Sequence, residues 1–302
     1  MPRQPTDFVL AREAVVENLE LRPLSLGEIL DRTFSVYRRH FLLFAGIAAI
    51  PHLLVLAVQL LQIFLKAAPV PAAPPVTQQL QASGALLGLG FLLGILGLIV
   101  YVVAMLLSTG ATVFAVSELY LGRAITIGEA LRRMRGELGA LFGVLVLSGM
   151  AIMAGFVLLV IPGIYLLCRF AVSVPAALLE DLGPRSALER SYGLTKDFAK
   201  RAFLIYVLYF VLIFAAASLF QWPFLYGLTL SRNDPAMVRV WSALMQVGGF
   251  IAGILVTPVM TIATSLFYYD LRVRKEAFDL QVMMKAAGGS AALGGGVPSM
   301  LS

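Results

Sequence analysis

Six long stretches of apolar residues divide this sequence of 302 residues, and they constrain its fold more than any other feature. An α-helix rises about 1.5 Å per residue, so each stretch is long enough to cross the roughly 30 Å hydrocarbon core of a membrane. None of them contains an Asp or a Glu, and Arg169 is their only formal charge apart from Lys66 at one edge. The stretches are Phe41–Leu65, Gly84–Ser117, Leu138–Val160, Pro162–Leu179, Ala202–Leu230 and Val240–Tyr269.

The composition agrees with a membrane environment. Hydrophobic residues make up 60% of the chain and charged residues 13%, against roughly 45–50% and about 25% in soluble proteins. The single cysteine, Cys168, excludes a disulfide scaffold. We therefore predict an all-α fold, a polytopic membrane helical bundle with six transmembrane helices. Its expected parts are a cytoplasmic N-terminal segment at 1–23, a six-helix membrane domain at 24–280 and a disordered cytoplasmic tail at 281–302.

Lys and Arg are distributed unevenly between the connections. The N-terminal segment, the connections after the second and fourth spans, and the tail hold 19 of the 23 basic residues, whereas the alternate connections hold 3. Because basic residues are retained on the cytoplasmic side, this asymmetry predicts a multi-pass protein with both termini in the cytoplasm. The net charge of +6 then indicates contact with anionic head groups of membrane lipids, and not a nucleic-acid surface.

An internal repeat precedes the first and third spans. The run Leu24–Arg32 returns as Ile125–Arg133, with near-identity at nine positions. Each copy begins with a capping box and continues with apolar residues at the i, i+3, i+4, i+7 spacing of an amphipathic helix. We expect both helices to lie in the cytoplasmic membrane interface. The two predicted boxes are Ser25 with Glu28, and Thr126 with Glu129.

A weaker third copy precedes the fifth span. A third capping box, Ser186 with Glu189, is expected there, but aligning it shifts the register by three residues. Two interpretations stay open: ordinary helix capping, or a threefold repeat of an interfacial helix followed by a helical hairpin. Duplicated membrane segments of this kind are common in transporters.

Four motifs stand out along the chain: Leu24–Phe34, Ile161–Tyr165 followed by Arg169, Phe170, Pro175 and Ala176, then Ala187–Ser191, and Tyr268–Glu276. Together they resemble a known family, the membrane domain attached to some bacterial glycerophosphoryl diester phosphodiesterases. The resemblance covers about residues 21–280, nearly the whole chain that is expected to be ordered, and its last motif is the most specific. It implies a helical domain of the bacterial cytoplasmic (inner) membrane.

The same resemblance argues against an activity in this chain. In the family, phosphodiesterase chemistry resides in a separate barrel domain that needs histidines, carboxylates and a divalent metal. This sequence has two histidines, His40 and His52, and no soluble region of the roughly 200 residues that such a barrel requires. We therefore expect no catalytic residue, no cofactor and no metal site.

Arg169 is the one charge expected deep inside a span. A charge there costs about 2.5–3.5 kcal/mol or more. It could bind a lipid phosphate or an anionic substrate, or it could hydrogen-bond carbonyls freed near Pro162 or Pro175. Its distance from Pro162 places it nearer the outer surface, which argues against a cytoplasmic lipid. We predict that Arg169 faces the bundle interior and bonds to carbonyls or a polar cavity.

The segment Asp270–Arg274 ends the last span with mixed charge. It either pairs with charges of the interfacial helices, and so closes the bundle, or remains a solvated helix end. The expected partners are Arg32, Arg133 and the capping-box glutamates. The full set of candidate polar sites is Glu28, Arg32, Glu129, Arg133, Arg169, Arg190, Asp270 and Arg272.

Two functions remain in competition. The first is an integral membrane protein without catalytic activity, acting as an accessory, scaffold or lipid-associated module. The second is a transporter or lipid permease with a polar cavity near Arg169. A polar cavity that reaches Arg169 favours transport, whereas a dry, tightly packed core favours a scaffold. The sequence indicates membrane lipids as partners and leaves protein partners and a homo-oligomer open.

Overall fold

The computed structural model describes residues 23–66 and 76–276, and every regular element in these ranges is an α-helix. The tail and the first 22 residues of the expected N-terminal segment lie outside the described residues. The helices are α2 (Leu26–Arg39), α3 (Phe41–Lys66), α4 (Val76–Tyr120), α5 (Ile127–Arg133), α6 (Leu138–Leu158), α7 (Val160–Arg169), α8 (Ser173–Leu179), α9 (Pro184–Leu194), α10 (Ala199–Phe220), α11 (Trp222–Leu230) and α12 (Pro235–Glu276).

Six helical segments in the described ranges are long and apolar enough to cross a membrane. This confirms the predicted all-α polytopic bundle, and the protein is an integral membrane protein. The candidate spans are Phe41–Phe64, Gly90–Tyr120, Leu138–Leu158, Val160–Leu179, Ala199–Phe220 and Pro235–Glu276. The predicted fifth span is divided, because α10 ends at Phe220 and α11 begins with Pro223 in its first turn, where the missing N–H of proline is tolerated.

The fourth span is not one straight helix. A hairpin joins α6 to α7 at Leu159. Gly155 and Gly163 allow the close approach, since a Cβ on Gly155 would lie 3.0 Å from the Gly163 backbone. Ten residues later α7 ends, after about 15 Å. That is half of a hydrocarbon core of roughly 30 Å.

Hydroxyl groups of α9 hold the break between α7 and α8. The carbonyl of Arg169 accepts hydrogen bonds from Ser191 Oγ and Thr195 Oγ1, each at 2.9 Å. The amide of Val172 donates to Ser191 Oγ at 3.3 Å. These bonds satisfy backbone groups that the end of a helix leaves free. The chain therefore turns beneath α9 and continues as the short helix α8.

Two of the three predicted helix starts are correct. Ser25 with Glu28 and Thr126 with Glu129 form complete capping boxes at the starts of α2 and α5. The third box is wrong: α9 begins at Pro184, after Gly183, and has no side-chain cap. Proline has a backbone angle preset for the first helical turn, so it starts the helix before Ser186 is reached.

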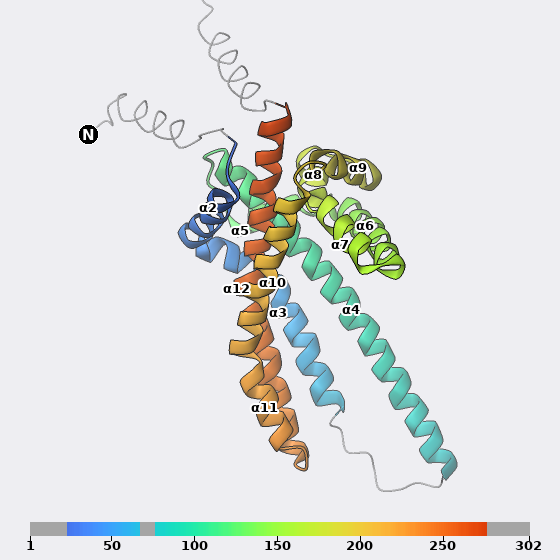
Figure 1. The fold of residues 1–302 in the computed structure, drawn as a ribbon. Coiled ribbons are helices and arrows are strands. Elements are labelled where there is room, and N and C mark those ends of the chain that lie inside the picture. The colour runs from blue at the N-terminus through green and yellow to red at the C-terminus, as the bar shows by residue number, and fades with distance from the viewer. Residues whose placement is uncertain (1–22, 67–75, 277–302) are drawn as a thin grey trace, which may run out of the picture.

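Figure 1 shows α2, α5, α8 and α9 gathered at one end of the bundle, together with the carboxyl-terminal turns of α12. We call this the charged end. Away from it, α3, α4 and α10–α12 extend as long rods, and α4 diverges from α12. The amide of Leu24 donates to Asp270 Oδ1 at 2.7 Å, so both ends of the described chain meet at the charged end.

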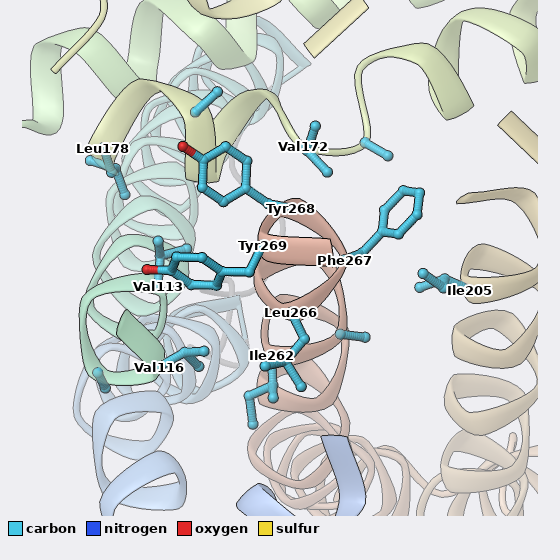
Figure 2. Packing of buried hydrophobic residues seen from close by; sticks show 14 of the residues in the cluster. Val113, Val116, Val172, Leu178, Ile205, Ile262, Leu266, Phe267, Tyr268 and Tyr269 are labelled. Carbon is cyan, nitrogen blue, oxygen red and sulfur yellow. The ribbon is translucent and has the colours of Figure 1, made fainter. Parts of the chain in front are cut away.

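The core lies around the last turns of α12. Every residue from Thr261 to Leu271 is buried. In Figure 2, Tyr268 and Tyr269 point to one side of the helix, while Phe267 points toward Ile205 of α10. Tyr269 donates to Ser117 Oγ of α4 at 2.9 Å. The last helix of the chain is thus the element against which the others pack.

Candidate functional site

Asp270 is the centre of one charge cluster at the charged end, which we call the Asp270 cluster. Its side chain is fully buried, and its carboxylate lies 2.9 Å from Arg274 Nε and 3.3 Å from Arg201 Nη1. It also accepts the Leu24 amide, and the Leu24 carbonyl in turn accepts from both arginines. Three segments of the fold are therefore joined around one carboxylate: α10, the last turns of α12, and Leu24, which lies two residues before α2 begins.

A second group of charges, the Glu180 cluster, follows α8. Glu180 accepts hydrogen bonds from Arg190 Nε at 2.8 Å and from the Tyr268 hydroxyl at 2.6 Å. Arg272 Nε lies 3.0 Å from Glu276 Oε2, and Glu276 also pairs with Arg190. Burial favours the neutral carboxyl of Glu180, but its hydrogen bonds and the neighbouring arginines outweigh burial and lower its pKa.

These contacts decide between the two interpretations of the last segment. The segment closes the bundle, and the partners named from the sequence are wrong. Arg133 pairs with Glu118 at the end of α4, at 2.6 Å. The carboxylates of Glu28 and Glu129 bond to the amides of their own caps. Arg32 is half-buried on α2 and makes no ion pair with any described residue. Each of these capping bonds joins residues that are three positions apart in the sequence.

A cavity of about 380 Å³ lies inside the bundle, among α3, α4, α6, α10, α12 and the segment from α7 to α8. Most of the side chains around it are apolar. None of them is an Asp, Glu, Lys or Arg, and His52 supplies the one imidazole ring in the lining. The polar residues in the lining are His52, Tyr101, Thr109, Ser148, Ser173, Tyr206, Tyr209, Thr257, Thr261 and Thr264.

Four hydroxyl groups in this lining, those of Ser148, Ser173, Thr261 and Thr264, donate hydrogen bonds to nearby backbone carbonyls. Ser148 Oγ donates to the Val144 carbonyl at 2.6 Å, and Thr264 Oγ1 to the Thr261 carbonyl at 3.1 Å. A ring nitrogen of His52, Nδ1, lies 2.7 Å from the Ala48 carbonyl. Hydroxyl oxygens that have donated their proton still accept. The cavity therefore suits an apolar chain that carries an uncharged donor.

The cavity passes close to Arg169 without including it. Leu167, Phe170 and Ala171 line the cavity, whereas the side chain of Arg169 lies on another side of α7. The described interior is therefore neither a dry core nor a cavity that reaches the arginine. The residues that line the cavity were not predicted from the sequence. One signal was present, because Thr257, Thr261 and Thr264 follow the i, i+4, i+7 spacing of one helix face.

Arg169 faces the protein interior as predicted, and its residue is 1% exposed. No carbonyl of the described residues accepts a hydrogen bond from its side chain, although such bonds were expected. The guanidinium carbon lies 3.7 Å from the ring centroid of Tyr192 on α9 and 5.6 Å from that of Tyr165. Its Nε and Nη1 have no hydrogen-bond partner among the described residues. A hydrogen bond from Tyr165 and the charge of Arg169 lower the pKa of Tyr192.

The continuous helix from which the depth of Arg169 was predicted is broken in the structure. Distance along the fourth stretch placed it nearer the outer surface, but that distance assumed a continuous helix. Because α7 ends at Arg169 and its carbonyl bonds to Ser191 and Thr195, the residue lies beneath α9 at the charged end.

Comparisons with protein-family models, curated proteins and solved structures find no match. Among the described residues no group of three or more His, Cys, Asp or Glu is placed to hold a metal ion. The geometry therefore offers three features on which a function can rest: the two charge clusters, the uncharged cavity and the isolated arginine.

Proposed function

We propose that this protein is a lipid-associated module of the bacterial cytoplasmic membrane, without catalytic activity of its own, whose cavity holds the chain of a membrane lipid. The cavity carries this proposal. It is about 380 Å³ in volume, it lies between helices that qualify as membrane spans, and its lining is apolar with uncharged acceptors. The resemblance to the membrane domain of glycerophosphoryl diester phosphodiesterases supports an accessory or scaffold role.

A lipid gains little by leaving the bilayer for an apolar cavity, because lipid tails are as apolar as leucine side chains. Two other contributions to the binding free energy favour a lipid chain in the cavity. An empty cavity lacks dispersion contacts on its lining, and a chain that fills it restores them. The hydroxyl oxygens of residues such as Thr257 and Thr261 can accept a hydrogen bond from a glycerol or amide group. The expected ligand is therefore a lipid with an uncharged donor near its chains.

The charge asymmetry supports the same setting. With 19 basic residues in one set of connections and 3 in the other, both termini lie in the cytoplasm in this proposal. The charged end then faces the cytoplasmic leaflet, where anionic lipids are concentrated. An activity reporter fused after Leu280 should work only as a cytoplasmic fusion, and periplasmic reporter activity would contradict this orientation.

Photo-crosslinking tests the proposal. A lipid with a diazirine near the middle of its acyl chain should label cavity peptides around Tyr206 in the full-length protein. The variant Ala104→Phe fills the cavity, because Ala104 lines it and is 3% exposed. It should remove most of that labelling. The matched control Val103→Phe places the same ring on the next residue, which is 41% exposed, and should leave cavity labelling unchanged.

Labelling confined to outward residues such as Phe210, and unaffected by either variant, would contradict the proposal. Phe210 is 68% exposed, so it reports ordinary contact with the bilayer. This surface labelling also confirms that both variants are folded and reconstituted.

Transport of a lipid is the second candidate. The cavity lies among helices of all three hairpin units, and transporters place their substrates between structural repeats. The protein reconstituted in vesicles should then accelerate the exchange of a fluorescent lipid between leaflets, and Ala104→Phe should slow that exchange. Cavity labelling without accelerated exchange would favour the lipid-associated module over the permease.

A further inference from the structure

Arg169 is a buried charged residue that lacks a full set of hydrogen-bond partners among the described residues. The residue is 1% exposed, and two of its nitrogens, Nε and Nη1, have no hydrogen-bond partner in the described part of the chain. No described carboxylate lies within ion-pair distance of it. Leaving a buried donor unsatisfied costs about 1–3 kcal/mol, and more when the group is charged. The two nitrogens of Arg169 are therefore able to donate hydrogen bonds to an acceptor that the described residues do not supply.

Two tyrosines cover the guanidinium. Its central carbon lies 3.7 Å from the ring centroid of Tyr192, where a cation is attracted to the face of the ring. Tyr165 lies one helical turn before Arg169 on α7, and its hydroxyl is hydrogen-bonded to that of Tyr192. The exposed fractions of Tyr165 and Tyr192 are 47% and 42%. Rotation of exposed side chains is fast and needs no movement of the backbone, so the arginine can be uncovered.

The backbone beneath this group is fixed. Hydroxyls of Ser191 and Thr195 both donate to the Arg169 carbonyl, which ties the end of α7 to α9. The exposed cation Lys196 lies close enough to act electrostatically on Tyr192. The site therefore combines a rigid base, two free guanidinium donors, two tyrosine hydroxyls and a second positive charge. Every one of these features favours a ligand with negative charge.

We propose that Arg169, Tyr165 and Tyr192 form a binding site for a phosphate group. A phosphate offers several acceptor oxygens and full charge, and arginine binds it through strong charge-assisted hydrogen bonds. The source is either the head group of an anionic phospholipid or free phosphate. The position beneath α9 at the charged end suits a lipid, because basic pockets between helices at a membrane surface bind such head groups.

This site is separate from the cavity. Arg169 does not line the cavity, and Ala104 and Thr261, which do, do not contact Arg169 in any described ion pair or ring contact. The phosphate proposal therefore does not rest on the proposed function, and each can fail alone. A lipid chain that never labels the cavity leaves the phosphate site intact.

Thermal unfolding of the full-length protein in nanodiscs tests the site. A ligand that binds the folded state raises the melting temperature. Adding phosphatidylglycerol to phosphatidylcholine nanodiscs should raise the melting temperature of the natural protein. Arg169→Gln should remove most of this rise, and it should weaken binding of a soluble short-chain phosphatidylglycerol by about tenfold or more. Arg169→Lys keeps the charge without the planar fork and should retain part of the response.

The matched control is Arg132→Gln, which removes one positive charge from the exposed surface of α5. It should keep the response, because it affects only the general attraction to anionic lipid. Native mass spectrometry should detect a retained phosphatidylglycerol on the natural protein and on the Arg132→Gln variant, and not on Arg169→Gln. If Arg169→Gln does not fold, Tyr192→Leu removes the aromatic platform and should also reduce the response.

Inorganic phosphate distinguishes the two sources. A rise in melting temperature with phosphate in phosphatidylcholine nanodiscs, and not with chloride at equal ionic strength, assigns the site to free phosphate. A response to phosphatidylglycerol alone assigns it to a lipid head group. Equal responses of the natural protein and both Arg169 variants, or no response of the natural protein to either ligand, would overturn the proposal.

Discussion

Asp270 and Arg169 are both buried ionisable side chains at the charged end, and their surroundings differ in every respect. Asp270 has two arginines and a backbone amide as partners, whereas Arg169 has an aromatic ring and two unused nitrogens. A buried charge that is fully paired contributes to the closed structure and is costly to remove. One that lacks a counterion contributes little, so its side chain is better explained by a ligand than by folding.

Removal of Asp270 should have the largest effect. Asp270→Ala leaves Arg201, Arg274 and the Leu24 amide without their shared acceptor, and breaking one side of a buried pair costs about 3–5 kcal/mol. The free energy of unfolding in mixed micelles should fall by this amount. The control Glu189→Ala removes a carboxylate from an exposed pair with Arg185 and should change stability by less than about 1 kcal/mol. If Asp270→Ala and Glu189→Ala lowered the free energy of unfolding equally, the buried ion pairs of Asp270 would contribute no more than an exposed pair.

Glu180→Gln should have the next largest effect, because it weakens the hydrogen bonds from Arg190 and Tyr268. Bonds to a charged group contribute about 1.5–3 kcal/mol. The pKa of Glu180 is lowered in the folded protein, so its contribution is present above the ordinary Glu pKa of about 4.3. It is lost as the pH falls through the lower folded value. The stability difference between the natural protein and Glu180→Gln should therefore shrink on acidification, and a pH-independent difference would refute the role of its charge.

Ser191→Ala tests the backbone beneath Arg169. Its hydroxyl donates to the Arg169 carbonyl and accepts from the Val172 amide. Thr195 still bonds to the carbonyl in the variant, so the expected loss is one hydrogen bond, about 1 kcal/mol. Hydrogen exchange should quicken at Val172 and remain slow in α12. Unchanged exchange at Val172 would show that the end of α7 does not depend on α9.

Arg169→Gln should have the smallest effect on stability. In phosphatidylcholine alone it removes a charge that has no counterion, so its unfolding free energy should equal that of the natural protein or exceed it slightly. The contacts of the guanidinium with the rings of Tyr192 and Tyr165 are lost, and their loss of about 0.5–2 kcal/mol offsets part of the gain from removing the buried charge. A loss comparable to that of Asp270→Ala would show that the arginine is a structural residue like Asp270.

The sequence predicts those features whose physical cause is local. Long apolar stretches require helices in a membrane, so all six spans could be predicted, with ends that differ from those of the structure by up to ten residues. The capping boxes of α2 and α5 were equally accessible, because Ser25 and Glu28 are three residues apart. A helix start cannot be predicted from one motif when a second start signal lies nearby. Pro184 starts α9 in place of Ser186, and only the structure shows which signal prevails.

The remaining features depend on residues far apart in the chain. Glu180 and Tyr268 are 88 positions apart, and the break after Arg169 depends on Ser191 and Thr195, which are 22 and 26 positions later. The periodicity of apolar residues in the sequence does not show which of these distant residues contact one another. The cavity requires the relative positions of six segments, so its threonines read in the sequence as one ordinary helix face. Arg169, Arg190, Asp270 and Arg272 were named from the sequence, whereas their partners Glu180, Arg201 and Tyr192 were not.

The bond between Leu24 and Asp270 joins positions 246 residues apart, and this has a consequence for how the chain is made. A membrane protein inserts its helices as they leave the ribosome, beginning with the first. Throughout that process the Leu24 amide and its carbonyl lack the partners that α12 supplies. The amino-terminal helix α2 can reach its final position only when the last helix has been synthesised. In a chain truncated before Asp270, α2 would therefore lack these hydrogen bonds to α12. Cellular proteases should then degrade the truncated chain faster than the full-length protein.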